Sequence, residues 1–244
     1  MKTIKLKSDE TLDTIKDVKI IQSKKGYRFS IDAVILENFI RTKKYDEGIE
    51  FGTGSGVISI LLAKRSPYFK LTGVEIQKSL AERALTNVEL NGLEDRIDII
   101  RYDIKKLKDI FPAGKADLIF SNPPFRKPKT GRISIDNERA AARHELKITL
   151  SELIKTASYL LEDKGRFNLI YHPFRLIELI GLLQESQLEP KRMRFVHSRT
   201  GEEAKMVLVE AVKNSGTWLK IEPPLFIYED NGEYSAEMKS VYAG

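Results

Sequence analysis

The sequence predicts an α/β protein with a mostly parallel sheet and helices on both faces of that sheet. Short apolar segments alternate with longer segments of helical periodicity from residue 48 onward, and such alternation indicates repeated β-α units. A glycine-rich turn lies between the first strand and the first helix of this series. Because a short turn joins the last two predicted strands, we expect one of them to run antiparallel to the others.

The predicted elements follow from the spacing of apolar residues. The seven predicted strands cover residues 48–51, 71–75, 97–101, 117–121, 166–171, 192–197 and 206–212. The predicted helices cover residues 57–64, 77–91, 150–161 and 174–184, together with a helix that starts at Ser30 and a short helical turn after Asp103. Ser30 is the expected N-cap of its helix, and Asp32 in the first turn favours the helix dipole. The antiparallel strand should lie near the C-terminal edge of the sheet.

The length of 244 residues suits one large domain with small additions. We expect residues 1–29 to form a basic segment whose short strands pack on the core. Residues 30–213 are expected to form the main domain. Residues 214–244 are expected to form a tail, in which Asn231 and Gly232 favour a hairpin.

Composition narrows the class of protein. The chain has 41 Lys and Arg against 35 Asp and Glu, a formal net charge of +6, which is compatible with a polyanionic partner and equally with a basic enzyme that has none. It has no cysteine, which excludes disulfides, thiolate nucleophiles and zinc-thiolate sites and makes the cytoplasm the expected location. No apolar run approaches the ~18 residues that span a membrane, and we expect neither a membrane nor a metal partner.

The glycine-rich turn carries the first indication of a ligand. A dinucleotide fingerprint does not fit, because its third glycine would fall on Val57 or Ser59, and a P-loop does not fit, because no lysine lies between the glycines and Lys64. Glycine permits close approach to bare backbone, and the helix that follows offers free N–H groups. The remaining pattern, an acidic residue followed by alternate glycines, resembles that of S-adenosylmethionine sites. A glycine turn with no ligand is the alternative.

Four polar residues close successive predicted strands, and ligands of open α/β sheets collect at that edge. They are Glu50, Glu75, Asp103 and Asn122. If the ligand is S-adenosylmethionine, the glycine backbone would hold its methionine end, whose positive charges Glu50 would offset. The two oxygens of Glu75 suit the two ribose hydroxyls, and Asp103 could accept from the adenine amine.

The segment 121–125, Ser-Asn-Pro-Pro-Phe, indicates the chemistry most sharply. Two prolines remove two N–H donors and leave carbonyls, Asn122 adds an amide oxygen, and Phe125 adds a flat ring. This set suits a planar group that carries an exocyclic NH2, and base–aromatic stacking contributes about 1–3 kcal/mol. Hydrogen bonds to Asn122 Oδ1 and the Pro123 carbonyl would turn the amine lone pair toward a methyl donor without a general base. A rigid loop after a strand is the alternative.

With these motifs the chain resembles the bacterial class I methyltransferases, Rossmann-like enzymes that modify adenine N6 next to the anticodon of a valine tRNA. The resemblance covers nearly the whole chain and rests on segments 26–33, 50–56, 73–77, 122–125 and 142–145. It implies S-adenosylmethionine as cofactor, tRNA as partner and adenine 37 of a valine tRNA as target. The family usually has tyrosine where this chain has Phe125, and many guanine-N2 enzymes of ribosomal RNA have phenylalanine there.

Three other functions stay open at this point. Guanine-N2 methyltransferases of ribosomal RNA and glutamine-N5 methylases of proteins share the Asn-Pro-Pro chemistry, but they commonly carry an additional N-terminal domain for which the segment before Glu50 is too short. The third alternative, from a different class, is a binding module that keeps the cofactor fold without turnover.

The resemblance also assigns site residues. The catalytic set is Asn122, Pro123, Pro124 and Phe125. The cofactor-binding set is Tyr27, Phe29, Ser30, Glu50, Gly52, Thr53, Gly54, Gly56, Glu75, Ile76, Gln77, Asp103 and Asn122. The basic residues expected to contact RNA are Lys24, Lys25, Arg28, Arg126, Lys127, Lys129, Arg132, Arg139 and Arg143.

Overall fold

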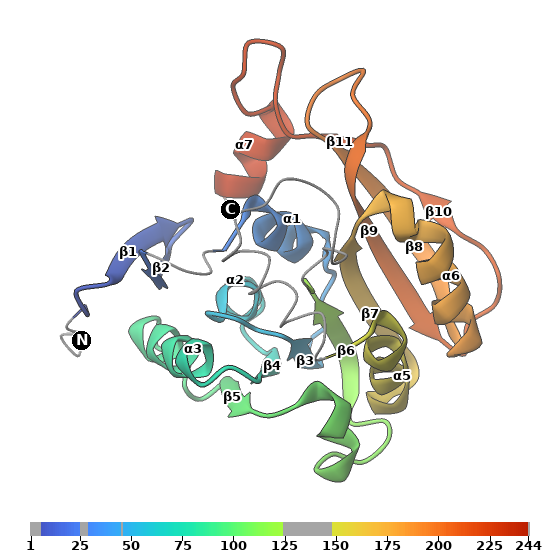
Figure 1. Ribbon diagram of the computed structural model, residues 1–244, viewed down its shortest axis with the longest axis horizontal. Coiled ribbons are helices and arrows are strands. Elements are labelled where there is room, and N and C mark those ends of the chain that lie inside the picture. Colours follow the sequence, from blue (N-terminus) through green and yellow to red (C-terminus); the bar gives the residue numbers. More distant parts are fainter. Residues whose placement is uncertain (1–5, 25–28, 45, 124–147, 244) are drawn as a thin grey trace, which may run out of the picture.

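The computed structural model describes residues 6–24, 29–44, 46–123 and 148–243 (Figure 1). Within these residues the central feature is a nine-stranded sheet in the order β10-β8-β9-β7-β6-β3-β4-β5, with β11 also paired to β8. Its strands are β3 (Glu47–Phe51), β4 (Lys70–Glu75), β5 (Ile97–Arg101), β6 (Ala116–Ser121), β7 (Leu161–Tyr171), β8 (Leu188–His197), β9 (Ala204–Lys213), β10 (Lys220–Ile221) and β11 (Leu225–Phe226).

The sheet is mostly parallel, as the sequence predicts. Strands β3 to β7 pair in parallel, and β9 runs antiparallel to both β7 and β8. The seven long strands therefore form the predicted sheet, and the two-residue strands β10 and β11 add to the free edge of β8. Strand β7 starts five residues before its predicted start at residue 166, because the exposed polar residues 162–164 disguise its first half.

Helices cover both faces of the sheet, and each face has its own apolar core. Figure 1 shows α5 and α6 on one face and α1, α2, α3 and α7 on the other. The helices are α1 (Ile31–Phe39), α2 (Val57–Arg65), α3 (Lys78–Leu90), α5 (Leu150–Leu160), α6 (Leu176–Glu185) and α7 (Ala236–Ala243), with 3-10 turns η1 (Ile104–Asp109) and η2 (Pro173–Arg175). None of them, within the described residues, is long and apolar enough to cross a membrane.

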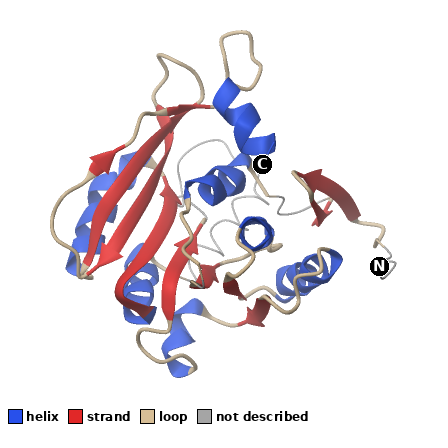
Figure 2. Ribbon diagram, turned by 180° about the vertical axis from the view of Figure 1, so that it is seen from behind, coloured by secondary structure: helices blue, strands red, loops and turns tan. Residues whose placement is uncertain are grey.

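The N-terminal segment forms a hairpin of β1 (Glu10–Ile15) and β2 (Val18–Ser23). It lies at the opposite end of the molecule from α6 (Figure 2). Asn87 of α3 holds it in place: this fully buried side chain accepts from Ile21 N at 2.7 Å and donates to the oxygens of Ile21 and Ser55 at 3.1 and 2.9 Å. One amide thus fixes β2 and the glycine turn relative to α3.

The tail after residue 213 packs on the main body. A hairpin was expected around Asn231, and the structure has one antiparallel bridge there, between Tyr228 and Tyr234. The helix that follows, α7, has no counterpart among the predicted elements. It buries Met238 and Val241 in the same core as α1 and α2.

Candidate active site

The glycine turn is shaped by its backbone. Gly52, Gly54 and Gly56 all have positive φ, at 74°, 59° and 84°, a conformation that costs an L-residue energy. The N–H groups of Gly52 and Thr53 both donate to the Val74 carbonyl, at 2.9 and 3.0 Å, which ties the turn to β4. A Cβ built on Gly52 meets nothing within 4 Å. The turn therefore presents bare backbone toward an open space.

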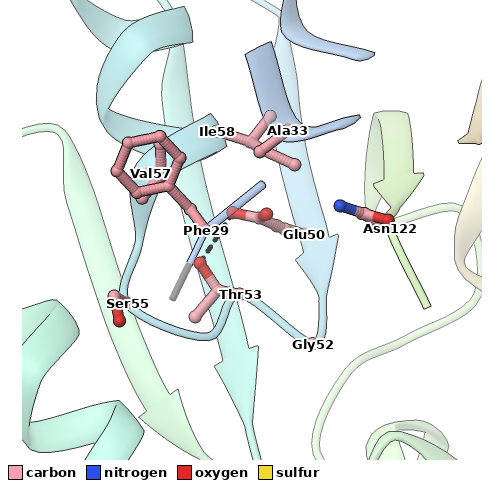
Figure 3. A pocket seen from close by; sticks show the side chains of 9 residues that line it. All are labelled: Phe29, Ala33, Glu50, Gly52, Thr53, Ser55, Val57, Ile58 and Asn122. Carbon is pink, nitrogen blue, oxygen red and sulfur yellow. Dashed lines mark hydrogen bonds between the residues drawn. The ribbon is translucent and has the colours of Figure 1, made fainter. Parts of the chain in front are cut away.

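Glu50 closes β3 beneath this turn and is 2% exposed. Its Oε2 accepts from the Thr53 hydroxyl at 2.6 Å (Figure 3) and, through a very short hydrogen bond, from the Ser59 hydroxyl. Burial raises the pKa of Glu50 to about 7, while the hydrogen bonds from Ser59 and Thr53 lower it. Glu50 therefore changes charge near neutral pH, at the end of β3 and beneath the glycine turn.

Glu75 closes β4, the neighbouring strand, and is 5% exposed. One carboxylate oxygen accepts from Gly54 N at 3.0 Å, and the other accepts from Gln77 N at 2.8 Å. Glu75 thus braces the glycine turn.

A pocket joins these groups to Asn122, which follows β6. It is partly open to solvent and is lined by Phe29, Ala33, Glu50, Gly52, Thr53, Ser55, Val57, Ile58 and Asn122. Figure 3 shows the Asn122 side chain facing Glu50 across the opening. Asn122 is close to the turn because β3 and β6 are neighbours, with Phe51 level with Ser121, whose hydroxyl donates to Phe51 O at 2.9 Å.

The other described residues of the predicted site lie around this pocket or at the same edge. Phe29 lines it, and Ser30 is the N-cap of α1, although its side chain makes no capping hydrogen bond. Asp103 accepts from Lys105 N at 3.0 Å as the N-cap of η1, at the end of β5. Lys24, a predicted RNA contact, is exposed and donates to Ser8 O at 2.8 Å.

Many predicted residues lie outside the described part of the chain. These are Tyr27, Pro124 and Phe125, and the basic residues Lys25, Arg28, Arg126, Lys127, Lys129, Arg132, Arg139 and Arg143. Their roles stay predictions.

The structure also adds residues that the sequence analysis did not single out. Ala33, Ser55, Val57 and Ile58 line the pocket, and Ser59 bonds Glu50 from the first turn of α2. Ser59 had a detectable signal, since it is one polar residue in an otherwise apolar helical run. Ser55 had no such signal in the sequence beyond its place between two glycines. Its buried hydroxyl has no hydrogen-bond partner in the described chain.

Comparison with known proteins identifies the family of the chain that forms this pocket. The family model described as methyltransferase small domain matches residues 31–186, more than half of the chain and all of the described pocket except Phe29. The chain belongs to the methyltransferase small domain family. This methyltransferase is 34% identical over 194 residues to a protein of Porphyromonas gingivalis named tRNA1(Val) (adenine(37)-N6)-methyltransferase, a match that covers 78% of this chain and 75% of that protein.

One further sequence relative and two solved structures are also similar to this chain. A protein of Trichodesmium erythraeum with the same name is 31% identical over 186 residues, covering 73% of this chain and 77% of the relative. Among solved structures, a predicted O-methyltransferase, Atu636 of Agrobacterium tumefaciens, has a TM-score of 0.70 at 21% identity and covers 87% of this chain and 95% of that one. TYW2 of M. jannaschii, solved with AdoMet, has a TM-score of 0.59 at 14% identity, covering 86% and 88%. These two structures show a shared fold.

The methyltransferase uses S-adenosylmethionine as its cofactor, and the described pocket fits such a group. The open space over Gly52 is the cradle that a Cβ would fill. The N-cap of α2, Gly56, brings no side chain to the first N–H groups of that helix. The unpartnered Ser55 hydroxyl is a further polar group at the same wall. When bound, S-adenosylmethionine supplies an electrophilic methyl group on a cationic sulfur. Among the described residues, no cluster of His, Asp and Glu is placed to hold a metal ion.

Proposed function

We propose that the enzyme methylates N6 of an adenine in the anticodon loop of a tRNA, at position 37 of a valine tRNA. The names of the Porphyromonas and Trichodesmium relatives support the substrate. The observation that carries the chemistry is the position of Asn122, which faces Glu50 across the pocket at the end of β6. A tRNA substrate makes the cytoplasm the working location.

Different residues of the chain are proposed to bind the cofactor and to position the target amine. The Gly52 and Gly54 backbone and the start of α2 would hold the methionine end of the cofactor, and Glu75 and Asp103 would hold its ribose and adenine. Asn122 Oδ1 and the Pro123 carbonyl accept the two N–H bonds of the target amine. These two hydrogen bonds would leave the nitrogen lone pair free to face the methyl donor, so that these residues act by positioning and preorganised dipoles. The nitrogen becomes acidic on methylation and would then release one proton to water, so no general base is needed before transfer.

The target adenine must leave its stack to reach Asn122. Extrusion costs a few kcal/mol and least for a base that is not paired. A base in an anticodon loop meets that condition, which favours a loop position over a paired one.

The test is methyl transfer to unmodified total tRNA from labelled S-adenosylmethionine, with the labelled nucleoside identified by mass. We expect N6-methyladenosine from the wild type. Asn122→Ala should lower the rate by about 100-fold or more, the usual effect of removing one preorganised hydrogen-bonding group. The matched control is Asn231→Ala, an exposed turn residue of the tail, which should methylate at the wild-type rate.

Each other outcome assigns a different function. N2-methylguanosine in ribosomal RNA would point to the guanine enzymes, and N5-methylglutamine in protein to the glutamine methylases. Equal label from wild type and Asn122→Ala would remove Asn122 from the chemistry.

A further inference from the structure

Beside Asn122, the next strand of the sheet carries two rings that the proposed chemistry does not use. Strands β6 and β7 are parallel neighbours, with Ser121 level with Leu169, and paired strands lie about 4.8 Å apart. The chain therefore leaves β7 at the same edge as Asn122. The residues there are His172, which follows β7, and Phe174 of η2.

These two rings form a built platform. They stack with centroids 5.2 Å apart and an interplanar angle of 25°. His172 Nδ1 lies 3.1 Å from the Lys205 carbonyl of β9, so the histidine is anchored to the sheet. Phe174 is nevertheless 67% exposed. One ring is thus held by the protein, while most of the ring stacked on it faces solvent. We call His172 and Phe174 the aromatic platform.

The residues around the platform favour stacking over charge as its mode of binding. Lys205, whose carbonyl anchors His172, is an exposed cation there, and Arg175 is held by Glu178 through two hydrogen bonds of 2.8 and 2.9 Å. Glu203 is a further exposed carboxylate. The sum of these charges is near zero. A ligand bound there would be stabilised by stacking on the flat apolar ring of Phe174, as a base is when it stacks on an aromatic side chain.

We propose that the aromatic platform stacks a nucleobase next to the target adenine and so positions the RNA for transfer at Asn122. This inference rests on the proposed RNA substrate and extends it to a contact with the flanking nucleotide. A target base that leaves its stack uncovers the faces of its neighbours. Phe174, one strand away from Asn122, covers one such face. Phe174 is a positioning residue, and it acts on the substrate alone.

The first experiment is spectroscopic and does not require turnover. An anticodon-stem hairpin carries 2-aminopurine on either side of the target adenine, and its fluorescence is followed as enzyme is added. Wild type should quench the label at one of the two positions, because stacking quenches it. Phe174→Ala should lose that quenching and bind the hairpin about 5- to 150-fold more weakly, the equivalent of one lost base stack. Phe174→Tyr, which keeps the ring, should restore both.

The second experiment separates positioning from folding and from charge. Phe174→Ala should raise KM for tRNA with kcat and donor affinity near wild type, and the slope of log Kd against log salt should be unchanged, because no phosphate contact is removed. The control is Tyr68→Ala, an aromatic residue 56% exposed before β4, at the opposite edge of the sheet. It should leave hairpin binding and KM unchanged.

The possible results are distinct. If the Phe174→Ala enzyme quenches the 2-aminopurine fluorescence and binds the hairpin as the wild type does, the stacking role of the platform is wrong, even where methyl transfer to tRNA is confirmed. Quenching that depends on Phe174 in an enzyme that modifies no tRNA adenine supports the platform and rejects the proposed reaction.

Discussion

Glu50 is buried and accepts hydrogen bonds from the hydroxyls of Thr53 and Ser59, and burial and hydrogen bonding have opposite effects on its pKa. Burial raises the pKa of Glu50 to about 7 from an ordinary value of 4.5, and the donors Ser59 and Thr53 hold it from rising further. The ionised form of Glu50 is therefore destabilised by its burial. A cationic group bound in the pocket would reduce that destabilisation, which links Glu50 to donor binding as well as to stability.

Glu50→Gln tests this link through pH. Between about pH 4.5 and 7 the folded protein holds a proton on Glu50 that the unfolded chain releases, so wild-type stability falls across this interval and then levels off. The variant has no such proton. Its unfolding free energy relative to wild type should rise by about 3 kcal/mol over the interval, measured by urea denaturation at a series of pH values.

Over the same pH range the affinity of the wild type for its methyl donor should rise, whereas its stability falls. Wild-type affinity for S-adenosylmethionine should increase from pH 5 to 7 as Glu50 ionises, and the affinity of Glu50→Gln should be lower and flat. Stability curves that stay parallel across this range would show that Glu50 does not titrate there.

Single residues of the site were predictable to different degrees. Glu50, Gly52, Glu75 and Asn122 could be placed together because strand ends of a parallel sheet meet at one edge. The hydrogen bond from Gly54 to Glu75 could not be predicted, because it depends on the path of the turn in three dimensions. Asn87 looks like an ordinary polar residue of a helix, and its role follows only from the packing of β2 against α3.

Among the elements, α1 shows how the site is held in place. Three arginines from other elements donate to carbonyls at its C-terminal end: Arg65 to Ile40 O at 2.6 Å, Arg192 to Phe39 O at 2.5 Å, and Arg166 to Arg41 O through a very short bond. Cations at a helix C-terminus satisfy its free carbonyls and oppose its dipole. The other end of α1 carries Ala33 of the pocket.

Arg192→Ala should therefore be costly. The side chain is 5% exposed, lies 3.3 Å from Glu210 and stacks 3.9 Å over the Phe39 ring. Its removal leaves the Glu210 carboxylate and the Phe39 carbonyl without that partner, and breaking a buried pair costs about 3–5 kcal/mol. Urea denaturation measures the loss. Lys239→Ala, which removes an exposed pair with Glu233, should show no measurable change, and equal effects of the two would contradict this role of Arg192.

Most elements were predictable because apolar periodicity marks them directly. The arginine contacts were not, because Arg166 and Arg192 look in the sequence like the polar residues of half-buried strands. Their partners lie 125 and 153 residues away, and no local pattern carries such a pairing.

At the scale of the whole molecule, the tail after residue 213 is part of the fold. Strands β10 and β11 extend the sheet beside β8, and Figure 1 shows α7 next to α1. Met238 of α7 is fully buried and belongs to the same core cluster as α1, α2 and the sheet. The sequence predicted a hairpin here and gave no indication of α7, because a short helix with two buried residues has little periodic signal.

Met238→Ala tests whether the tail and the main domain unfold together. Truncating a buried methionine costs about 2–5 kcal/mol, and because Met238 lies in the shared core, the whole transition should move to lower denaturant. Two probes should report the same midpoint: the far-UV signal of the helices, and the fluorescence of the single Trp218, which precedes β10. Ile221→Ala, at a position 61% exposed on β10, is the control and should leave the midpoint unchanged. A separate early transition seen by one probe would mean that the tail is an independent unit, because one shared core should give the same midpoint for both probes.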